Sequence, residues 1–221
     1  MIEFMTEQLT LWNNNALEHG TGLSPKPYPL SLPDADVVLY PAFFSCETSD
    51  RYLTHLLTEI NWRQETAYLF DKWIPLPRLT AWYGDAGKSY TYSGIKMQPE
   101  PWTKSLLSIK SAVETVTQVK FNSVLLNWYR DGSDSVGWHS DAEPVLGRNP
   151  VIASVSFGAS RRFSLKPKYH KSIKPIHLDL PHGSLLLMQG ATQHHWVHQV
   201  PKTTKSVGTR VNLTFRVVHH L

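Results

Sequence analysis

Short β-rich runs fill the second half of the chain and limit the folds that it can adopt. After Lys120, runs rich in aliphatic, β-branched and aromatic residues occupy positions 123–129, 151–157, 162–166, 184–188 and 211–218. Turn-forming residues separate these runs, and their spacing predicts a mainly antiparallel β-domain with its helices in the first half of the chain. The pattern is typical of a sandwich or a jelly roll, and it does not separate these two folds.

Two amphipathic helices are predicted before these strands. The first covers residues 48–60, with Thr48 or Ser49 as its cap, and its apolar residues recur at helical spacing: Leu53, Leu56, Leu57 and Ile60. The second begins near Pro101, which suits the first turn of a helix, and carries on one side Leu106, Ile109, Val113 and Val116. We expect both helices to pack on the core.

The first 35 residues differ in character from the rest of the chain. They contain the run Asn13-Asn14-Asn15 and several glycines and prolines, and they show no apolar periodicity. We therefore predict a loosely ordered N-terminal extension over residues 1–35. Residues 36–221 are predicted to form a single domain, because this length suffices to bury one core.

The composition indicates the cellular compartment of the protein but says little about its activity. The single cysteine, Cys46, excludes an internal disulfide and favours a reducing compartment. No secretion signal or run of membrane-spanning length occurs, so we expect a cytoplasmic monomer, nuclear if the source is eukaryotic, without a membrane partner. The formal net charge of +4 permits a polyanionic partner such as nucleic acid.

A histidine and an aspartate two residues apart form the strongest candidate for a metal site. His139 and Asp141 would point to the same side of an extended strand and could share one ion. Two histidines and one carboxylate on one face of an octahedron leave three positions open, as Fe(II) oxygenases require. On an extended strand His194 and His198 would also share a face, so spacing alone leaves either as the third ligand.

Seven segments in order along the chain resemble the AlkB family of 2-oxoglutarate and Fe(II)-dependent nucleic-acid dioxygenases, and within it the DNA-repair branch. They are residues 77–78, 83–87, 90–94, 127–143, 152–158, 182–186 and 210–216. The resemblance implies the double-stranded β-helix form of the jelly roll, with its core in residues 121–221. It also implies that residues 36–120 supply supporting helices and a nucleotide-recognition region with a substrate-binding hairpin.

The resemblance assigns the iron ligands, which are also the catalytic residues, to His139, Asp141 and His198. His194 and His195 are then neighbours that only form hydrogen bonds. It also assigns 2-oxoglutarate binding to a set of polar residues on two strands: Asn127, Tyr129, Arg210, Asn212 and Arg216.

Strand alternation supports this cosubstrate set. It places Arg210, Asn212 and Arg216 on one face of the last strand, and Asn127 and Tyr129 on one face of another. An arginine fork pairs well with a carboxylate. The two arginines stand about 20 Å apart at roughly 3.3 Å per residue, so they cannot easily hold the same atoms. We expect Arg216 to take the distal carboxylate.

The resemblance also implies residues that contact the nucleic acid. They are Phe70, Arg78, Tyr90, Tyr92, Ser93, Trp138 and Glu143. Tyr92 would stack on the extruded base, with the ring of His139 opposite, although Tyr90 and Tyr92 also suit a cross-strand aromatic pair.

Phe70 aligns with an aromatic wedge that fills the vacated base stack, and Arg78 with an arginine that holds the opened DNA. Asp71 departs from the family pattern, which has glycine after the wedge. Phe70 therefore remains either a wedge or a core residue, and duplex preference stays open.

A basic stretch is expected to contact phosphates, with a solvated loop as the alternative. It comprises Arg161, Arg162, Lys166, Lys168, Lys171 and Lys174.

The activity that the resemblance implies is oxidative demethylation of N-alkylated bases such as 1-methyladenine and 3-methylcytosine in single- or double-stranded DNA. The reaction would use Fe(II), O2 and 2-oxoglutarate and release succinate, CO2 and formaldehyde. RNA demethylation, hydroxylation of a protein or small molecule, and non-catalytic binding of nucleic acid remain alternatives.

Overall fold

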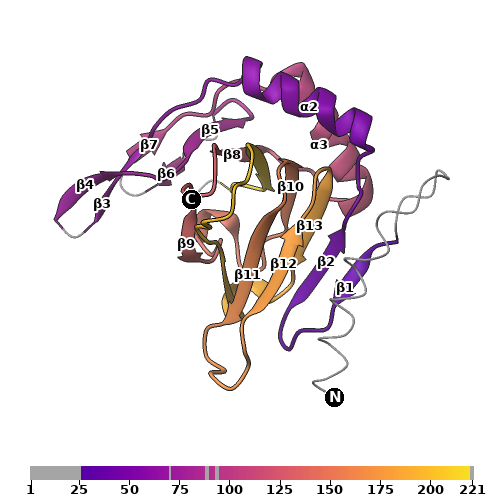
Figure 1. Ribbon diagram of the computed structural model, residues 1–221, viewed down its shortest axis with the longest axis vertical. Coiled ribbons are helices and arrows are strands. Elements are labelled where there is room, and N and C mark those ends of the chain that lie inside the picture. The colour runs from indigo at the N-terminus through magenta and orange to yellow at the C-terminus, as the bar shows by residue number, and fades with distance from the viewer. Residues whose placement is uncertain (1–25, 70, 88–89, 93–94, 220–221) are drawn as a thin grey trace.

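Two antiparallel sheets face each other in the computed structural model, which describes residues 26–69, 71–87, 90–92 and 95–219 (Figure 1). The larger sheet has seven strands in the order β1-β2-β13-β10-β15-β8-β5. They are β1 (Tyr28–Leu30), β2 (Asp36–Tyr40), β5 (Leu79–Gly84), β8 (Ser123–Tyr129), β10 (Ile152–Gly158), β13 (Ser184–Gln189) and β15 (Arg210–Arg216).

The smaller sheet has four strands in the order β12-β11-β14-β9. They are β9 (Val136–His139), β11 (Arg161–Pro167), β12 (Ile176–Leu180) and β14 (Trp196–Val200). All pairings within both sheets are antiparallel. The predicted jelly roll is confirmed.

Alternating side chains divide the core into two layers. On β15, Val211, Leu213 and Phe215 pack into a cluster beneath the helices. On β13, Leu185 and Leu187 join the same cluster, whereas their neighbours pack into a second cluster between the sheets. The polar face of β15 therefore lies between the sheets, where it borders a cavity.

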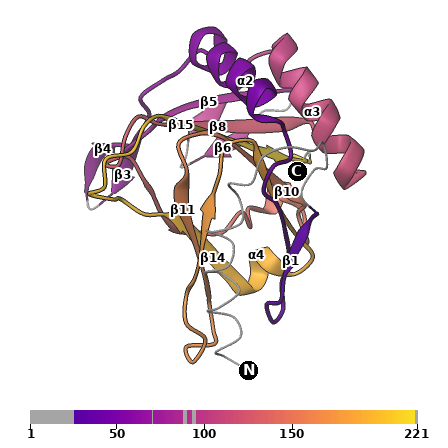
Figure 2. The ribbon, with the colours of Figure 1, turned by 45° about the vertical axis from the view of Figure 1, so that its right-hand side comes forward.

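Helices α2 (Cys46–Glu59) and α3 (Lys104–Thr117) cover the outer face of the larger sheet (Figure 2). The cap of α2 is Ser45, whose hydroxyl accepts the N–H of Thr48 at 3.2 Å, rather than the predicted Thr48 or Ser49. Helix α3 begins after its cap Thr103, so Pro101 precedes the helix. None of the helices in the described residues has the length and apolar character that a bilayer span requires.

The N-terminal half contributes strands as well as helices. Strand β1 lies within the region predicted to be loosely ordered, and only residues 26–35 of that region belong to the described part of the chain. Strand β2 pairs with β13, and β5 pairs with β8, because both carry apolar residues that complete the larger sheet.

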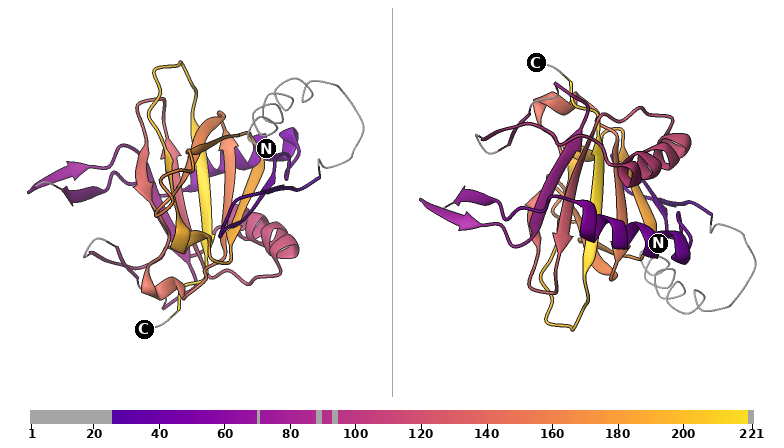
Figure 3. Two further views of the ribbon diagram at one scale, coloured as in Figure 1. Left: turned by 90° about the horizontal axis from the view of Figure 1, so that it is seen from below. Right: turned by 90° about the horizontal axis from the view of Figure 1, so that it is seen from above.

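Two hairpins stand beside the sheets. They are β3 (Thr66–Leu69) with β4 (Lys72–Pro75), and β6 (Tyr90–Tyr92) with β7 (Ile95–Met97). The first hairpin projects away from the body of the molecule (Figure 3). Asp71, in its turn, has φ = 59°, a conformation that glycine adopts most easily and aspartate tolerates. This explains how Asp71 replaces the glycine of the family pattern.

Candidate metal centre

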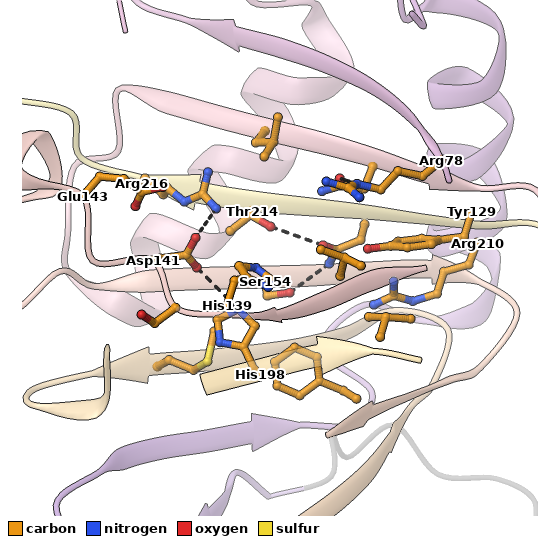
Figure 4. Close-up of a pocket in the computed structure, with 18 residues that line it drawn as sticks. Arg78, Tyr129, His139, Asp141, Glu143, Ser154, His198, Arg210, Thr214 and Arg216 are labelled. Carbon is orange, nitrogen blue, oxygen red and sulfur yellow. Dashed lines mark hydrogen bonds and ion pairs between the residues drawn. The ribbon is translucent and has the colours of Figure 1, made fainter. Parts of the chain in front are cut away.

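Three side chains from two neighbouring strands and the segment after one of them form a compact cluster. His139 on β9 lies opposite His198 on β14, and Asp141 follows two residues after His139. One potential ligand atom from each residue lies within 4.8 Å of the others. The cluster lines a cavity of about 120 Å³ between the sheets (Figure 4). The predicted set is thus brought together by adjacent strands.

The electrostatics of the cluster favour metal binding. Burial, followed by the neighbouring His139, lowers the pKa of His198 to about 3, so its imidazole is neutral at physiological pH. Burial would raise the pKa of Asp141, but the charge of Arg216 holds that pKa below its ordinary value. Two imidazoles and one carboxylate are the donor set of a 2-His-1-carboxylate site, which suits Fe(II) and leaves coordination positions open.

Neighbouring groups orient each ligand. The Nδ1 atom of His139 lies 2.8 Å from the carbonyl oxygen of Gly137, an arrangement that makes Nδ1 the donor and leaves Nε2 for an ion. The ring of His198 stacks on Phe163, with centroids 5.2 Å apart. The backbone N–H of Asp141 donates to Oε1 of the buried Gln193 at 2.9 Å, and Arg216 pairs with the carboxylate.

The rival ligand His194 lies outside the cluster. Residues Thr192–His195 form a helical turn, α4, rather than an extended strand. The exposed His194 therefore turns away and contacts the carbonyl oxygen of Arg148 and Oδ1 of Asn149. The expectation that His194 shares a face with His198 is wrong, because the strand β14 begins only at Trp196.

The predicted cosubstrate residues line the same cavity from β8 and β15. Arg210 pairs with Tyr129, and Asn212 with Asn127, in the register of the two strands. Asn212 donates to Oγ of Ser154 at 2.8 Å and to the carbonyl oxygen of Val155 at 2.9 Å. The alternation predicted for both strands is confirmed.

Arg210 lies at the end of the cavity away from the histidines (Figure 4). It is 1% exposed, and its guanidinium carbon lies 5.1 Å from the ring centre of Tyr129. Its Nη2 donates to Oγ of Ser156 at 2.9 Å, but its buried Nε and Nη1 atoms have no hydrogen-bond partner. Burial lowers the pKa of Arg210 to about 10, so the side chain remains a cation at neutral pH. A buried cation with two free donors fits a carboxylate of a bound ligand.

Arg216 lies at the opposite end of the polar face of β15, beside the metal cluster. Its Nη2 pairs with Oδ1 of Asp141. Arg210 and Arg216 stand at the two ends of β15, too far apart to contact the same carboxylate. Arg216 therefore fits a role next to the ion, in contrast to the expectation that it takes the distal carboxylate.

Two arginines expected on the nucleic acid are buried instead. Arg78 is 6% exposed, and its Nε donates to Oδ1 of Asn127 at 2.7 Å, so it orients a cavity residue rather than DNA. Arg161 is 2% exposed and donates to three backbone carbonyl oxygens, those of Asp131, Asp134 and Pro201, at 2.8–2.9 Å. The guanidinium groups of both arginines thus form hydrogen bonds within the protein.

Replacing Arg161 with glutamine should lower the free energy of unfolding by about 3 kcal/mol, since charge-assisted hydrogen bonds to buried carbonyl groups are lost. Urea denaturation measures this change. The matched control is Arg162→Gln, because Arg162 is exposed and only pairs with the exposed Asp179 at 3.5 Å. That variant should stay within about 0.5 kcal/mol of the wild type. Equal losses for both variants would contradict the structural role of Arg161.

The remaining predicted substrate residues differ in their placement. Glu143 lines the cavity, and its buried Oε2 has no hydrogen-bond partner. Trp138 does not line it, because this side chain is on the other face of β9 from His139. Tyr90 and Tyr92 lie on β6, but their side chains, like all of Phe70 and Ser93, fall outside the described residues.

Three supporting residues were not predicted from the sequence. Gln193 holds the backbone of Asp141, and Ser154 and Ser156 hold Asn212 and Arg210. Only their alternation with buried apolar neighbours on β10 would have placed the two serines on the cavity side. Gln193 lies in a helical turn that no periodicity predicts.

Comparisons with known proteins agree with this site. Residues 36–216 match the 2OG-Fe(II) oxygenase superfamily. The chain is 47% identical over 191 residues to mouse alpha-ketoglutarate-dependent dioxygenase alkB homolog 3, covering 83% of this chain and 66% of the mouse protein. It is 41% identical over 182 residues to human DNA oxidative demethylase ALKBH2, covering 80% of this chain and 67% of that protein.

A solved structure supports the fold. OsALKBH1 superposes with a TM-score of 0.60 at 18% identity, covering 87% of this chain and all (100%) of that chain. The metal cluster and Arg210, with its two free donor atoms, fit the ion and the cosubstrate that the superfamily description names. The chain therefore belongs to the 2OG-Fe(II) oxygenase superfamily and, within it, to the AlkB-type dioxygenases, which take Fe(II), 2-oxoglutarate and O2.

Proposed function

We propose that this protein removes methyl groups oxidatively from base nitrogens in DNA, with 1-methyladenine and 3-methylcytosine as substrates. The observation that carries the proposal is a single cavity that holds the His139, Asp141 and His198 cluster at one end and the buried, incompletely bonded Arg210 at the other. The two relatives named above, one of which is called a DNA oxidative demethylase, support the choice of substrate.

The ion would lie between His139, Asp141 and His198, and bound iron with 2-oxoglutarate would supply the oxidising power. In our assignment Arg210, with Tyr129 against its guanidinium, holds the distal carboxylate of 2-oxoglutarate. Arg216 holds Asp141 in place and adds positive charge near the other carboxylate. Asn127 and Asn212 then line the space between the two ends of the cosubstrate.

Glu143 would read the base. Its unpaired Oε2 is an acceptor buried in the cavity wall, and both proposed bases carry an exocyclic amino group that can donate to it. Hydroxylation of the methyl group gives a hemiaminal, which breaks down to formaldehyde and the restored base. Tyr90, Tyr92, Ser93 and Phe70 remain proposed substrate contacts on the two hairpins, outside the described residues or with side chains outside them.

Residues 36–221 are proposed to act as one catalytic domain and as a monomer. Because the proposed substrate is DNA, we place the protein in the cytoplasm, or in the nucleus if the source is eukaryotic.

Mass spectrometry of two single-stranded oligodeoxynucleotides, one with a single 1-methyladenine and one with a single 3-methylcytosine, tests the proposal. Incubation with Fe(II), ascorbate and 2-oxoglutarate should remove one methyl group and release one succinate for each base repaired, because both products come from one turnover. His139→Ala should give neither product, and Glu143→Gln should retain the metal but repair the base more slowly. A matched RNA oligomer runs in parallel.

Turnover of the RNA alone would reject DNA as the substrate. Succinate without loss of a methyl group from either 1-methyladenine or 3-methylcytosine would reject nucleic-acid demethylation. A protein that is folded and iron-loaded but makes no succinate would reject the catalytic assignment as a whole.

A further inference from the structure

A second cavity, of about 580 Å³, lies on the outer face of the smaller sheet. Its wall includes Trp138 of β9 and Val197 of β14, whereas the next residues along these strands, His139 and His198, line the metal cavity. Successive side chains of a strand point to opposite faces of its sheet. The two cavities therefore lie back to back, with β9 and β14 as their common wall.

The second cavity is strongly cationic. Lys166, Lys168 and Lys171 line it, and no acidic residue of the described chain does. His170 also lines it, with its Nε2 atom 3.9 Å from Oδ2 of Asp34. Among the described residues, none of the three lysines has a carboxylate within ion-pair distance. Lys168 is fixed by donating to the carbonyl oxygen of Gln193 at 2.8 Å. Such a concentration of like charges is unfavourable in the free protein and favours an anionic ligand.

An aromatic ring lies among these cations. Trp138 is 37% exposed, more than most other tryptophans of the described chain. The ammonium group of Lys166 lies 4.3 Å from the centre of its ring. An accessible indole next to ammonium groups matches the two parts of a nucleotide, because a base stacks on an aromatic face and a phosphate pairs with a lysine. A simple anion would need no ring, and an apolar ligand would need no cations.

We propose that this cavity binds a nucleotide that flanks the target base in the same nucleic-acid strand. The base of that nucleotide lies against Trp138, and its phosphate lies at Lys166 and Lys171. The proposal rests on the function proposed above, because the target base enters the metal cavity on the other side of the same wall. Strand β9 is the edge of the smaller sheet, so a nucleic-acid strand can pass around it from one cavity to the other.

Fluorescence anisotropy of a labelled, unmethylated oligothymidylate tests the cavity with the full-length, metal-loaded protein. Trp138→Ala should weaken binding about fivefold or more, the lower end of the loss of one base stack, while Trp138→Phe should restore most of the affinity. Lys166→Gln should make the salt dependence of log K shallower by about one. The control is Lys104→Gln on α3, an equal change of charge at an exposed site on the far side of the larger sheet, which should bind as the wild type.

Wild-type affinity and salt dependence in both Trp138→Ala and Lys166→Gln would overturn the proposal. Equal competition by polyglutamate would assign the cavity to acidic peptides and would overturn it as well. If Trp138→Ala does not fold, Lys166→Gln still decides the outcome, because wild-type salt dependence in that variant alone would then overturn the proposal.

The experiment separates this proposal from the function on which it rests. If the wild type demethylates an oligomer but the two variants bind like the wild type, only the flanking-nucleotide site fails. If the wild type demethylates no methylated oligomer, the proposed function fails, and a flanking site for its target base fails with it even where the anisotropy changes as expected.

Discussion

Arg210→Gln should raise KM for 2-oxoglutarate on the order of 100-fold or more, because losing one partner of a buried charge pair costs about 2–5 kcal/mol. The same variant should leave the cosubstrate-free protein at least as stable as the wild type. In that state Arg210 is 1% exposed with two unpaired donors, so its removal takes away a desolvation penalty. Succinate release against 2-oxoglutarate concentration, and thermal unfolding without cosubstrate, measure the two effects.

Opposite directions of these two effects identify Arg210 as a ligand-binding residue. Arg210→Lys retains the charge but loses the planar fork, and an intermediate KM is expected. Arg51→Gln, an equal change at an exposed position of α2, serves as the control and should change neither quantity. An unchanged KM in Arg210→Gln would contradict the assignment and return the distal carboxylate to Arg216.

Asp141→Asn should weaken Fe(II) or Mn(II) binding about 100-fold or more and abolish turnover. Structural sites with four ligands bind zinc with about 10–16 kcal/mol, which corresponds to a few kcal/mol for each ligand. The amide keeps the shape of the side chain but loses the negative charge between the two histidines and the ion pair with Arg216. Calorimetric titration without oxygen measures the affinity.

The matched control for this variant is Glu143→Gln. Glu143 is an acid in the same cavity, but it does not belong to the cluster of possible ligands. Its metal affinity should therefore equal that of the wild type. Loss of affinity in Glu143→Gln with retention in Asp141→Asn would exchange the roles of the two carboxyl groups.

Regular, buried strands explain which features could be predicted from the sequence. Strand alternation put Arg210 and Asn212 on one face and Val211 and Leu213 on the other, and β15 follows this pattern because both of its faces are covered. The pairing of His139 with Asp141 was also predicted, although β9 ends at His139 and a hydrogen bond from the backbone N–H of Asp141 to Oε1 of Gln193 completes the geometry.

Local irregularity and burial explain what could not be predicted. His194 was placed on a strand because nothing in its neighbourhood signals the helical turn of α4. Arg161 was expected on phosphates, as part of a basic stretch, and Arg78 was expected to hold opened DNA, because neither a charge pattern nor a motif shows that a side chain is buried. The choice between Arg210 and Arg216 depends on which end of β15 lies beside β9 and β14, and no local pattern contains this information.

Strand β9 lies at the edge of the smaller sheet and contributes residues to both cavities, so the stability of this strand affects both of them. In the described part of the chain β9 pairs only with β14, and the register between them is interrupted between His198 and Val200. Short edge strands fray more readily than central ones. An ion held by His139 and His198 would fasten this edge, because the free energy of metal binding adds to the free energy needed to open it. Loss of the metal would then make Trp138 as well as His139 more mobile. A protein without iron would therefore bind the flanking nucleotide more weakly, in addition to losing its catalytic activity.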